Sequence, residues 1–259
     1  MANTTSKTPK ARKASGRGEY TSPAVGKAID VIEFLARQEQ SVSVTAIAEG
    51  LGRTVGEIYR IVLALEQRRI VSRDEATDRL RLSLRLFDLA NQFPPVERLI
   101  QVARPKMDTL TRRAMQSCHL AAAEDREVTV VATRESPLSM RYSVRTGSSY
   151  DMFETSSGAV IAAYMEEAHR ERWLKWAKPP IRDSLRSRFE EIRIRGYEMR
   201  ESQTVSGLSN ISVPIHSQQG RILAALTVPY LAQTKSTLDP EGVLALQLEA
   251  AARMKDELG

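Results

Sequence analysis

Residues 42–81 constrain the fold most, because two runs of helical spacing in this segment are separated by only a few residues. The apolar positions are Val44, Ile47, Ala48 and Leu51 in the first run, then Val55, Ile58, Ile61, Val62 and Leu65 in the second. Each run places its apolar side chains on one helical face. Gly52 directly follows the first run and is a typical helix stop. The pattern predicts two helices joined by a sharp corner.

A β-hairpin is predicted directly after the second helix. Residues 70–72 and 80–82 are short runs that alternate with polar positions, and residues 73–79 between them have the composition of a turn. A helix–turn–helix followed by a two-stranded wing is a DNA-reading shape, whose second helix fits the major groove. The first hypothesis is therefore a DNA-binding regulator rather than an enzyme.

Polar residues at the start of the second helix and at the base of the wing form the candidate DNA-reading set. Arginine can donate to guanine O6 and N7, glutamate can accept from cytosine N4, and hydroxyls suit phosphates or bases. The candidates are Thr45, Arg53, Thr54, Gly56, Glu57, Tyr59, Arg60, Arg73 and Arg79. For any one of them, a solvated surface position is the alternative. Gly56 costs roughly 1 kcal/mol relative to alanine in a helix, which either close approach of the backbone to DNA or simple tolerance of glycine would explain.

Residues 1–20 predict a basic, disordered arm. The segment carries Lys7, Lys10, Arg12, Lys13 and Arg17 against one acidic residue, Glu19. It has too little apolar surface to fold alone, so it is either a solvated leader or an arm that contacts phosphates. The chain as a whole has a formal net charge of +6. No apolar run is long enough to span a bilayer, which favours a cytoplasmic protein without membrane partners.

Prolines and glycines divide the chain into further segments. A helix over residues 23–37 completes a DNA-binding domain that covers residues 21–83. Residues 84–115 predict linker helices, with a break at Pro94 and Pro95 and a kink or restart at Pro105. Residues 116–259 form a second domain with an α+β sensor sheet rather than a βαβ unit. Its predicted strands are 118–123, 128–133, 141–145, 211–215 and 222–228, and its predicted helices are 156–165, 167–176, 185–195 and one that starts at Asp239.

Short motifs along both domains carry a family resemblance. They lie at residues 25–32, 45–48, 60–66, 79–82, 147–158, 185–197, 205–215 and 220–227. In their order and spacing they resemble the IclR-type bacterial transcriptional regulators. The resemblance implies a winged helix–turn–helix, a linker helix and a GAF-like α/β effector-binding domain for a small organic ligand. It also implies homodimers, often paired into tetramers, on a palindromic operator in double-stranded DNA, and no cofactor.

The same resemblance implies where the effector binds. The implied lining is Ser156, Ser157, Leu208, Asn210 and Thr227, with Met140, Tyr142, Met152 and Arg200 as additions. Ser156 and Ser157 open a predicted helix, whose free N–H groups and dipole attract an anion. The sequence departs from the family at Ala159, Asp151, Asn210 and Arg200 and in the turn at residues 53–59. We expect an atypical operator and an atypical organic acid with hydroxyl or aromatic character.

Two other functions compete with a ligand-responsive regulator. The first is an enzyme, but the sequence shows no set of residues typical of an active site. Cys118 and His119 are neighbours on a predicted strand and point to opposite faces, and His169 and His216 lie elsewhere. No metal-ligand spacing and no phosphate loop is present, so no catalytic or metal residue is predicted. The second alternative is a DNA-binding protein without an effector, whose large domain serves only oligomerisation. Stability across metabolite mixtures distinguishes it from a sensor.

Overall fold

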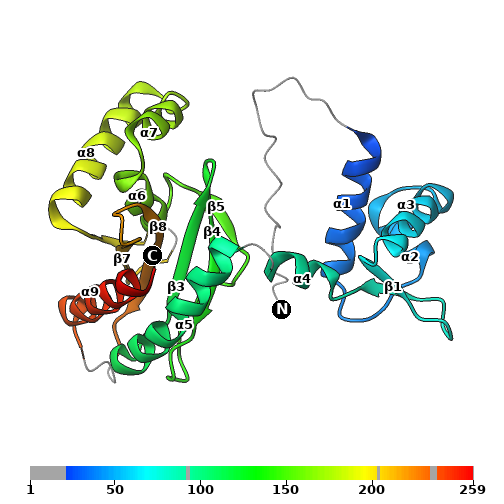
Figure 1. The fold of residues 1–259 in the computed structure, drawn as a ribbon, viewed down its shortest axis with the longest axis horizontal. Coiled ribbons are helices and arrows are strands. Elements are labelled where there is room, and N and C mark those ends of the chain that lie inside the picture. Colours follow the sequence, from blue (N-terminus) through cyan, green and yellow to red (C-terminus); the bar gives the residue numbers. More distant parts are fainter. Residues whose placement is uncertain (1–21, 92–93, 203–204, 234–237, 259) are drawn as a thin grey trace, which may run out of the picture. The chain divides into compact units, whose positions relative to one another are not determined.

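The structure is a computed structural model that describes residues 22–91, 94–202, 205–233 and 238–258. The chain divides into two compact units, residues 1–90 and residues 91–259, and each is described separately (Figure 1). The predicted basic arm, residues 1–20, lies outside the described residues.

The first unit is a small helical domain with a two-stranded wing. Its elements are α1 (Pro23–Ala36), α2 (Val44–Leu51), α3 (Val55–Gln67), β1 (Val71–Arg73) and β2 (Leu80–Leu82), followed by α4 (Arg85–Asn91). The apolar positions of the two helical runs meet in one core, where Ile47, Ile58 and Val62 are fully buried with Val31 of α1 and Leu80 of the wing. The predicted order of helix, corner, helix and hairpin is confirmed.

Local signals fix the corner between α2 and α3. The Ser43 hydroxyl accepts a hydrogen bond from the Ala46 N–H and caps α2. Gly52 ends α2 in the left-handed conformation, with φ of 61°, which a residue with a side chain rarely adopts. Thr54 caps α3 in the same way as Ser43 caps α2, by accepting from the Glu57 N–H. The corner is therefore three residues long.

The second unit is built on a six-stranded antiparallel sheet. The strand order is β5–β4–β3–β8–β7–β6. The strands are β3 (Cys118–Glu124), β4 (Glu127–Arg134), β5 (Ser149–Asp151), β6 (Glu198–Glu201), β7 (Leu208–His216) and β8 (Ile222–Leu231). The helices are α5 (Pro94–Ala114), α6 (Ser156–Tyr164), α7 (Glu167–Leu174), α8 (Pro179–Arg195) and α9 (Pro240–Glu257).

The two faces of this sheet have separate hydrophobic cores. α5 and α9 pack on one face, where Cys118 and Leu120 of β3 are buried. α6, α7 and α8 pack on the other, against Ala121 of β3 and Ala225 of β8. Because successive strand residues alternate between faces, Cys118 and His119 point in opposite directions, as the sequence predicts. Burial also raises the pKa of the Cys118 thiol to about 12.

The prediction of a strand at residues 141–145 is wrong. This segment is irregular, and the third strand of that region is β5 at Ser149–Asp151. The backbone of this segment is bonded to a side chain rather than to a neighbouring strand: the Thr133 hydroxyl donates to the Val144 carbonyl at 2.7 Å. The alternating pattern arises because two of its side chains, Tyr142 and Val144, face a cavity.

The segment predicted as linker helices also differs from the sequence-based expectation. The proline pair opens α5 rather than preceding it, and α5 runs through Pro105 without a restart. Met107 and Leu110 of α5 belong to the core of the second unit. The boundary between the units, after Ala90, therefore divides the predicted linker between them. β6 was not predicted, and α8 begins six residues before its predicted start at Leu185.

Candidate DNA-reading face and effector cavity

Charged residues at the start of α3 are tied to α1 by ion pairs. Arg53 donates to Asp30 at 2.9 Å and to Glu57 at 3.4 Å, and Lys27 also pairs with Glu57. The hydrogen bond from Lys27 holds the pKa of the Glu57 carboxyl below its usual value. Two of the candidate base-reading residues, Arg53 and Glu57, are therefore engaged within the unit. Neither Lys27 nor Asp30 was singled out from the sequence, because their role depends on a contact between helices.

The other candidates around α3 are exposed. Thr45 on α2 and Tyr59 and Arg60 on α3 lie on the surface, with Tyr59 47% exposed. A side chain at Gly56 would meet no atom within 4 Å, so packing inside the unit does not require glycine there. The Thr54 hydroxyl is engaged as the cap of α3. These positions leave Thr45, Tyr59 and Arg60 as the side chains most available to a partner.

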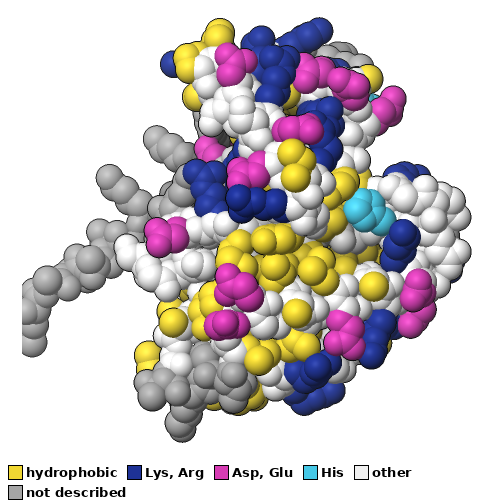
Figure 2. All heavy atoms as spheres, turned by 90° about the vertical axis from the view of Figure 1, so that its left-hand side faces the viewer, with side chains coloured by type: hydrophobic (Ala, Val, Ile, Leu, Met, Phe, Trp, Pro, Cys, Tyr) yellow, Lys and Arg dark blue, Asp and Glu magenta, His cyan; other side chains and the backbone are white. Residues whose placement is uncertain are grey.

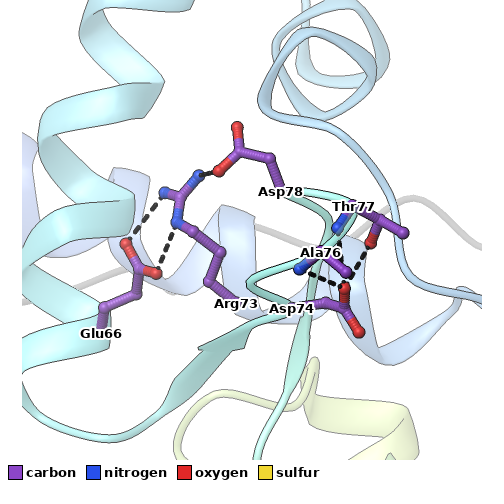
Figure 3. A network of polar contacts seen from close by, with 6 residues as sticks. All are labelled: Glu66, Arg73, Asp74, Ala76, Thr77 and Asp78. Atoms are coloured by element: carbon purple, nitrogen blue, oxygen red, sulfur yellow. Dashed lines mark hydrogen bonds and ion pairs between the residues drawn. The ribbon is translucent and has the colours of Figure 1, made fainter.

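The base of the wing is held by a network around Arg73 (Figure 3). The guanidinium makes two contacts with Glu66 of α3, at 2.9 and 3.0 Å, and one with Asp78 at 2.7 Å. These carboxylates raise the pKa of Arg73. Asp74 accepts from the N–H groups of Ala76 and Thr77 and orders the turn. Arg73 thus links α3 to the wing, whereas the exposed Arg79 donates to the Ser41 carbonyl.

A cavity of about 140 Å³ lies on the sheet face of the second unit that α6 only partly covers. A cavity of about this size holds a molecule as large as benzene. The lining residues are His119, Val130, Tyr142, Val144, Tyr150, Glu154, Thr155, Ser156, Ser157, Arg188, Arg200, Glu201, Ser202, Asn210 and Thr227. Six of them are among the predicted effector residues: Tyr142, Ser156, Ser157, Arg200, Asn210 and Thr227.

Three predicted effector residues do not line this cavity. Met152 and Leu208 are buried at 0% and 2% exposure, and Met140 is 72% exposed in the irregular segment. The carbonyl of Met152 instead lies so close to Gly158 that a Cβ there would stand 2.0 Å from it. The backbone before α6 therefore packs directly onto the start of the helix, which explains the glycine in this motif.

The amino terminus of α6 opens at the cavity. Thr155 caps the helix by accepting from the Gly158 N–H at 3.0 Å. The backbone N–H groups of Ser156 and Ser157 have no acceptor among the residues that the structure describes. Free N–H groups at a helix amino terminus, together with the helix dipole, favour a negatively charged group. Arg200, exposed at the cavity, adds a positive charge, opposite Asn210 on the neighbouring strand.

Arg188 of α8 fixes the loop that leads into α6. Its guanidinium donates twice to Glu198 of β6, at 2.6 and 2.8 Å, and also to the carbonyls of Phe153 and Thr155. The side chains of Arg188 and Glu198 are only 16% and 8% exposed. This pair was missed from the sequence because it joins a helix to a strand ten residues away.

His119 and Thr227 are paired across β3 and β8 in the floor of the cavity. The Thr227 hydroxyl shares a 2.7 Å hydrogen bond with Ser212 of β7. The His119 Nδ1 is buried and has no hydrogen-bond partner among the described residues. Burial lowers the pKa of its imidazole to about 4. The sequence predicted only that His119 lies on the opposite face of the sheet from Cys118. Its position in the floor of the cavity depends on the register between β3 and β8.

A larger cleft, of about 320 Å³, lies between α5 and α9. Four of its charged side chains are engaged with one another, because Lys106 pairs with Glu257, and Arg113 pairs with Glu249 at 3.0 Å. Among the described residues, none of the buried polar atoms without a partner lines this cleft, in contrast to the His119 Nδ1 in the smaller cavity. Within the described ranges, no cluster of His, Cys, Asp and Glu could hold a metal ion, and no helix is long and apolar enough to cross a membrane.

Two family models match the chain and together cover most of it. The model for the bacterial transcriptional regulator IclR C-terminal domain matches residues 96–256, and that for the IclR helix-turn-helix domain matches residues 24–75. A similar protein is the glycerol operon regulatory protein of Streptomyces coelicolor, 27% identical over 88% of this chain and 91% of its own length. The regulator KdgR of Escherichia coli is 20% identical over 91% of this chain and 92% of its own length.

Solved structures share the fold. The IclR structure of Thermotoga maritima has a TM-score of 0.72 at 22% identity, covering 92% of this chain and 99% of its own. An IclR homologue from Microbacterium hydrocarbonoxydans, crystallised with 4-hydroxybenzoate, has a TM-score of 0.75 at 23% identity, covering 91% of this chain and 98% of its own.

Proposed function

The chain belongs to the IclR family of bacterial transcriptional regulators, and on that premise we propose that it is a ligand-responsive regulator of catabolic genes. Its effector is a small organic acid bound in the cavity beside α6. The single observation that carries this proposal is the pair of unengaged N–H groups of Ser156 and Ser157, which open into a partly open, partly apolar cavity. The relative crystallised with 4-hydroxybenzoate supports an effector of this class.

The effector site is tested by isothermal titration of the full chain with aromatic and hydroxy acids. We expect Arg200→Ala and Asn210→Ala each to weaken binding about tenfold or more, because both remove polar partners at the cavity. Met140→Ala is the matched control, because Met140 lies in the adjacent segment but outside the cavity. Binding of an acid that neither cavity substitution changes would contradict this site.

The DNA partner we propose is a palindromic operator, bound by a homodimer or a dimer of dimers. Thr45, Tyr59 and Arg60 are the proposed direct contacts, whereas Arg53, Glu57 and Arg73 position α3 and the wing through the ion pairs described above. Thr54 caps α3, Gly56 permits close approach of the backbone, and Arg79 contacts a flanking phosphate.

Fluorescence anisotropy with operator DNA tests these contacts. Loss of a phosphate contact in Arg60→Ala would weaken binding for every sequence and reduce the slope of affinity against salt by about 1. Loss of a base contact would relax specificity at one position instead. Arg37→Ala, at the end of α1, is the control, because Arg37 is exposed and, among the described residues, forms an ion pair with Glu33 alone. An unchanged affinity and specificity in Arg60→Ala would remove Arg60 from the interface.

A regulator also requires its two units to be coupled. We propose that effector binding changes the affinity for DNA, because α5 leads directly into β3, whose His119 lines the cavity. Anisotropy titrations with and without a saturating acid measure this coupling. Equal DNA affinities in the two titrations would overturn it.

The second candidate function is assembly without an effector, and the surface of α8 and α9 favours it. On this face, charged side chains of both signs interleave in the upper part, and hydrophobic side chains gather in a band below them (Figure 2). Ile194 of α8 and Leu248 of α9 are 76% and 42% exposed. Light scattering of Leu248→Glu tests this role: a smaller assembly, together with no thermal shift from any acid, would favour it.

A further inference from the structure

The floor of the cavity contains one polar group that the protein leaves unsatisfied. Thr227 and Ser212 satisfy each other through their hydroxyls, whereas the buried Nδ1 of His119 has no partner in the described part of the chain. Buried polar groups in proteins are nearly always paired, so an unpaired one beside a cavity indicates a partner that enters the cavity. His119 is 6% exposed and lines the cavity, so a group in the cavity can approach its ring.

The charge state of His119 decides what that partner is. Burial is the cause that lowers the pKa of the imidazole to about 4, so the ring is neutral near pH 7. A neutral imidazole offers one N–H donor and one nitrogen acceptor, and it has no net charge with which to attract a carboxylate. Its complement is a neutral group that both donates and accepts, and a hydroxyl is the smallest such group.

The floor and the anion-attracting end of the cavity belong to different elements, because His119 and Thr227 lie on β3 and β8, whereas Ser156 and Ser157 open α6. Ala121 and Ala225 lie two residues further along the strands that carry His119 and Thr227, and both pack under α6. A carboxylate at the start of α6 and a hydroxyl at His119 would therefore belong to two different groups of one small molecule.

We propose that His119 recognises a hydroxyl group of the effector, so that the cavity selects hydroxy acids over the same acids without the hydroxyl. This inference rests on the proposed acid-sensing function and specifies the ligand class of the same site. His119 acts here as a specificity-determining residue, because a site built to hydrogen-bond a hydroxyl rejects the analogue that would leave its buried nitrogen unpaired.

Matched acids provide the test. The full chain is titrated calorimetrically with benzoate, 3-hydroxybenzoate and 4-hydroxybenzoate, and with propionate and lactate. Wild type is expected to bind a hydroxy acid at least about tenfold more tightly than its partner acid. His119→Phe, which keeps a ring of similar size and removes both nitrogens, is expected to reduce this ratio to near one. His216→Phe is the matched control, because His216 is half-buried but lies outside the cavity, against the Tyr164 ring.

The outcomes separate the two proposals. A hydroxy acid preference that persists in His119→Phe, or its absence in wild type while acids still bind, overturns the role of His119 and leaves acid sensing intact. Binding of none of the acids overturns both. If His119→Phe does not fold, His119→Gln takes its place: a side-chain amide also donates and accepts, so the preference is expected to persist, and its loss without loss of benzoate binding counts against hydroxyl recognition.

Discussion

A histidine kept neutral by burial links the cavity to the stability of the second unit. In the unfolded chain its pKa is near 6.5, and in the folded protein burial lowers it to about 4. Between these values the unfolded state binds more protons than the folded state, so stability falls as the pH falls. Above about pH 6.5 the contribution of His119 to stability is fully present.

We therefore expect the free energy of unfolding of the second unit to lose about 2 kcal/mol through His119 between pH 7 and pH 5. Urea unfolding of wild type and His119→Phe at several pH values measures this as the difference between the two pH slopes. Burial also lowers the pKa of the half-buried His216. His216 contributes equally to the pH slope of both proteins, so its contribution cancels in the difference. Parallel slopes in the two proteins would show that the pKa of His119 is the same in the folded and the unfolded state.

Two glycines are expected to respond to alanine in opposite ways. A Cβ at Gly158 would stand 2.0 Å from the Met152 carbonyl, so Gly158→Ala must displace the backbone before α6 and weaken acid binding. A Cβ at Gly56 meets no atom within 4 Å, so Gly56→Ala is expected to stabilise the first unit by roughly 0.5–1 kcal/mol. Thermal unfolding and acid titration test both variants. A fall in DNA affinity for Gly56→Ala would support close approach of the backbone to DNA.

At the scale of elements, α6 depends on a neighbouring helix for the position of its amino terminus. Arg188 of α8 joins Glu198 of β6 to the Phe153 and Thr155 carbonyls, and this ion pair is largely buried. Arg188→Met would leave the Glu198 carboxylate buried without its partner, which costs about 3 kcal/mol of stability. Arg195→Met, in the exposed Arg195–Glu191 pair of the same helix, is expected to cost less than about 1 kcal/mol.

Denaturant unfolding measures the two costs, and acid titration measures their consequence for the cavity. Acid binding is expected to weaken in Arg188→Met and to remain unchanged in Arg195→Met. Equal costs for the two variants would show that Arg188 does not hold the loop before α6.

The elements differ in how far the sequence predicts them. The corner between α2 and α3 was predictable because its signals are local: apolar spacing and a stop at Gly52. The irregular segment before β5 was not, because side chains that face a cavity alternate like those of a strand. The cavity itself was predicted in part. Ser156 and Ser157 have a local signal, whereas the place of His119 and Arg188 depends on strand register and on contacts between distant elements.

At the scale of the whole molecule, the division into two compact units predicts that the proposed effector stabilises the second unit and leaves the stability of the first unit unchanged. An acid that binds only the folded second unit stabilises it by about 2.7 kcal/mol at 100 times its dissociation constant. Hydrogen exchange of the full chain without DNA should therefore slow in β3, β8 and α6, while the protection of α2 and α3 stays the same. An equal increase in hydrogen-exchange protection in both units on addition of the acid would indicate that the two units unfold together.

The irregular segment that bears Tyr142 and Val144 has a consequence for how such a sensor diversifies. This segment lies outside the strands of the sheet and accepts a hydrogen bond from the Thr133 hydroxyl, so its sequence is less restricted by strand pairing than that of β3 and β8. Substitutions in this segment change the cavity lining at Tyr142 and Val144, while the pairing of the strands stays intact. Under the proposed acid-sensing function, relatives of this regulator can thus come to bind other acids through changes in this segment alone, while the strands beneath keep the hydrogen-bonding groups of His119 and Thr227.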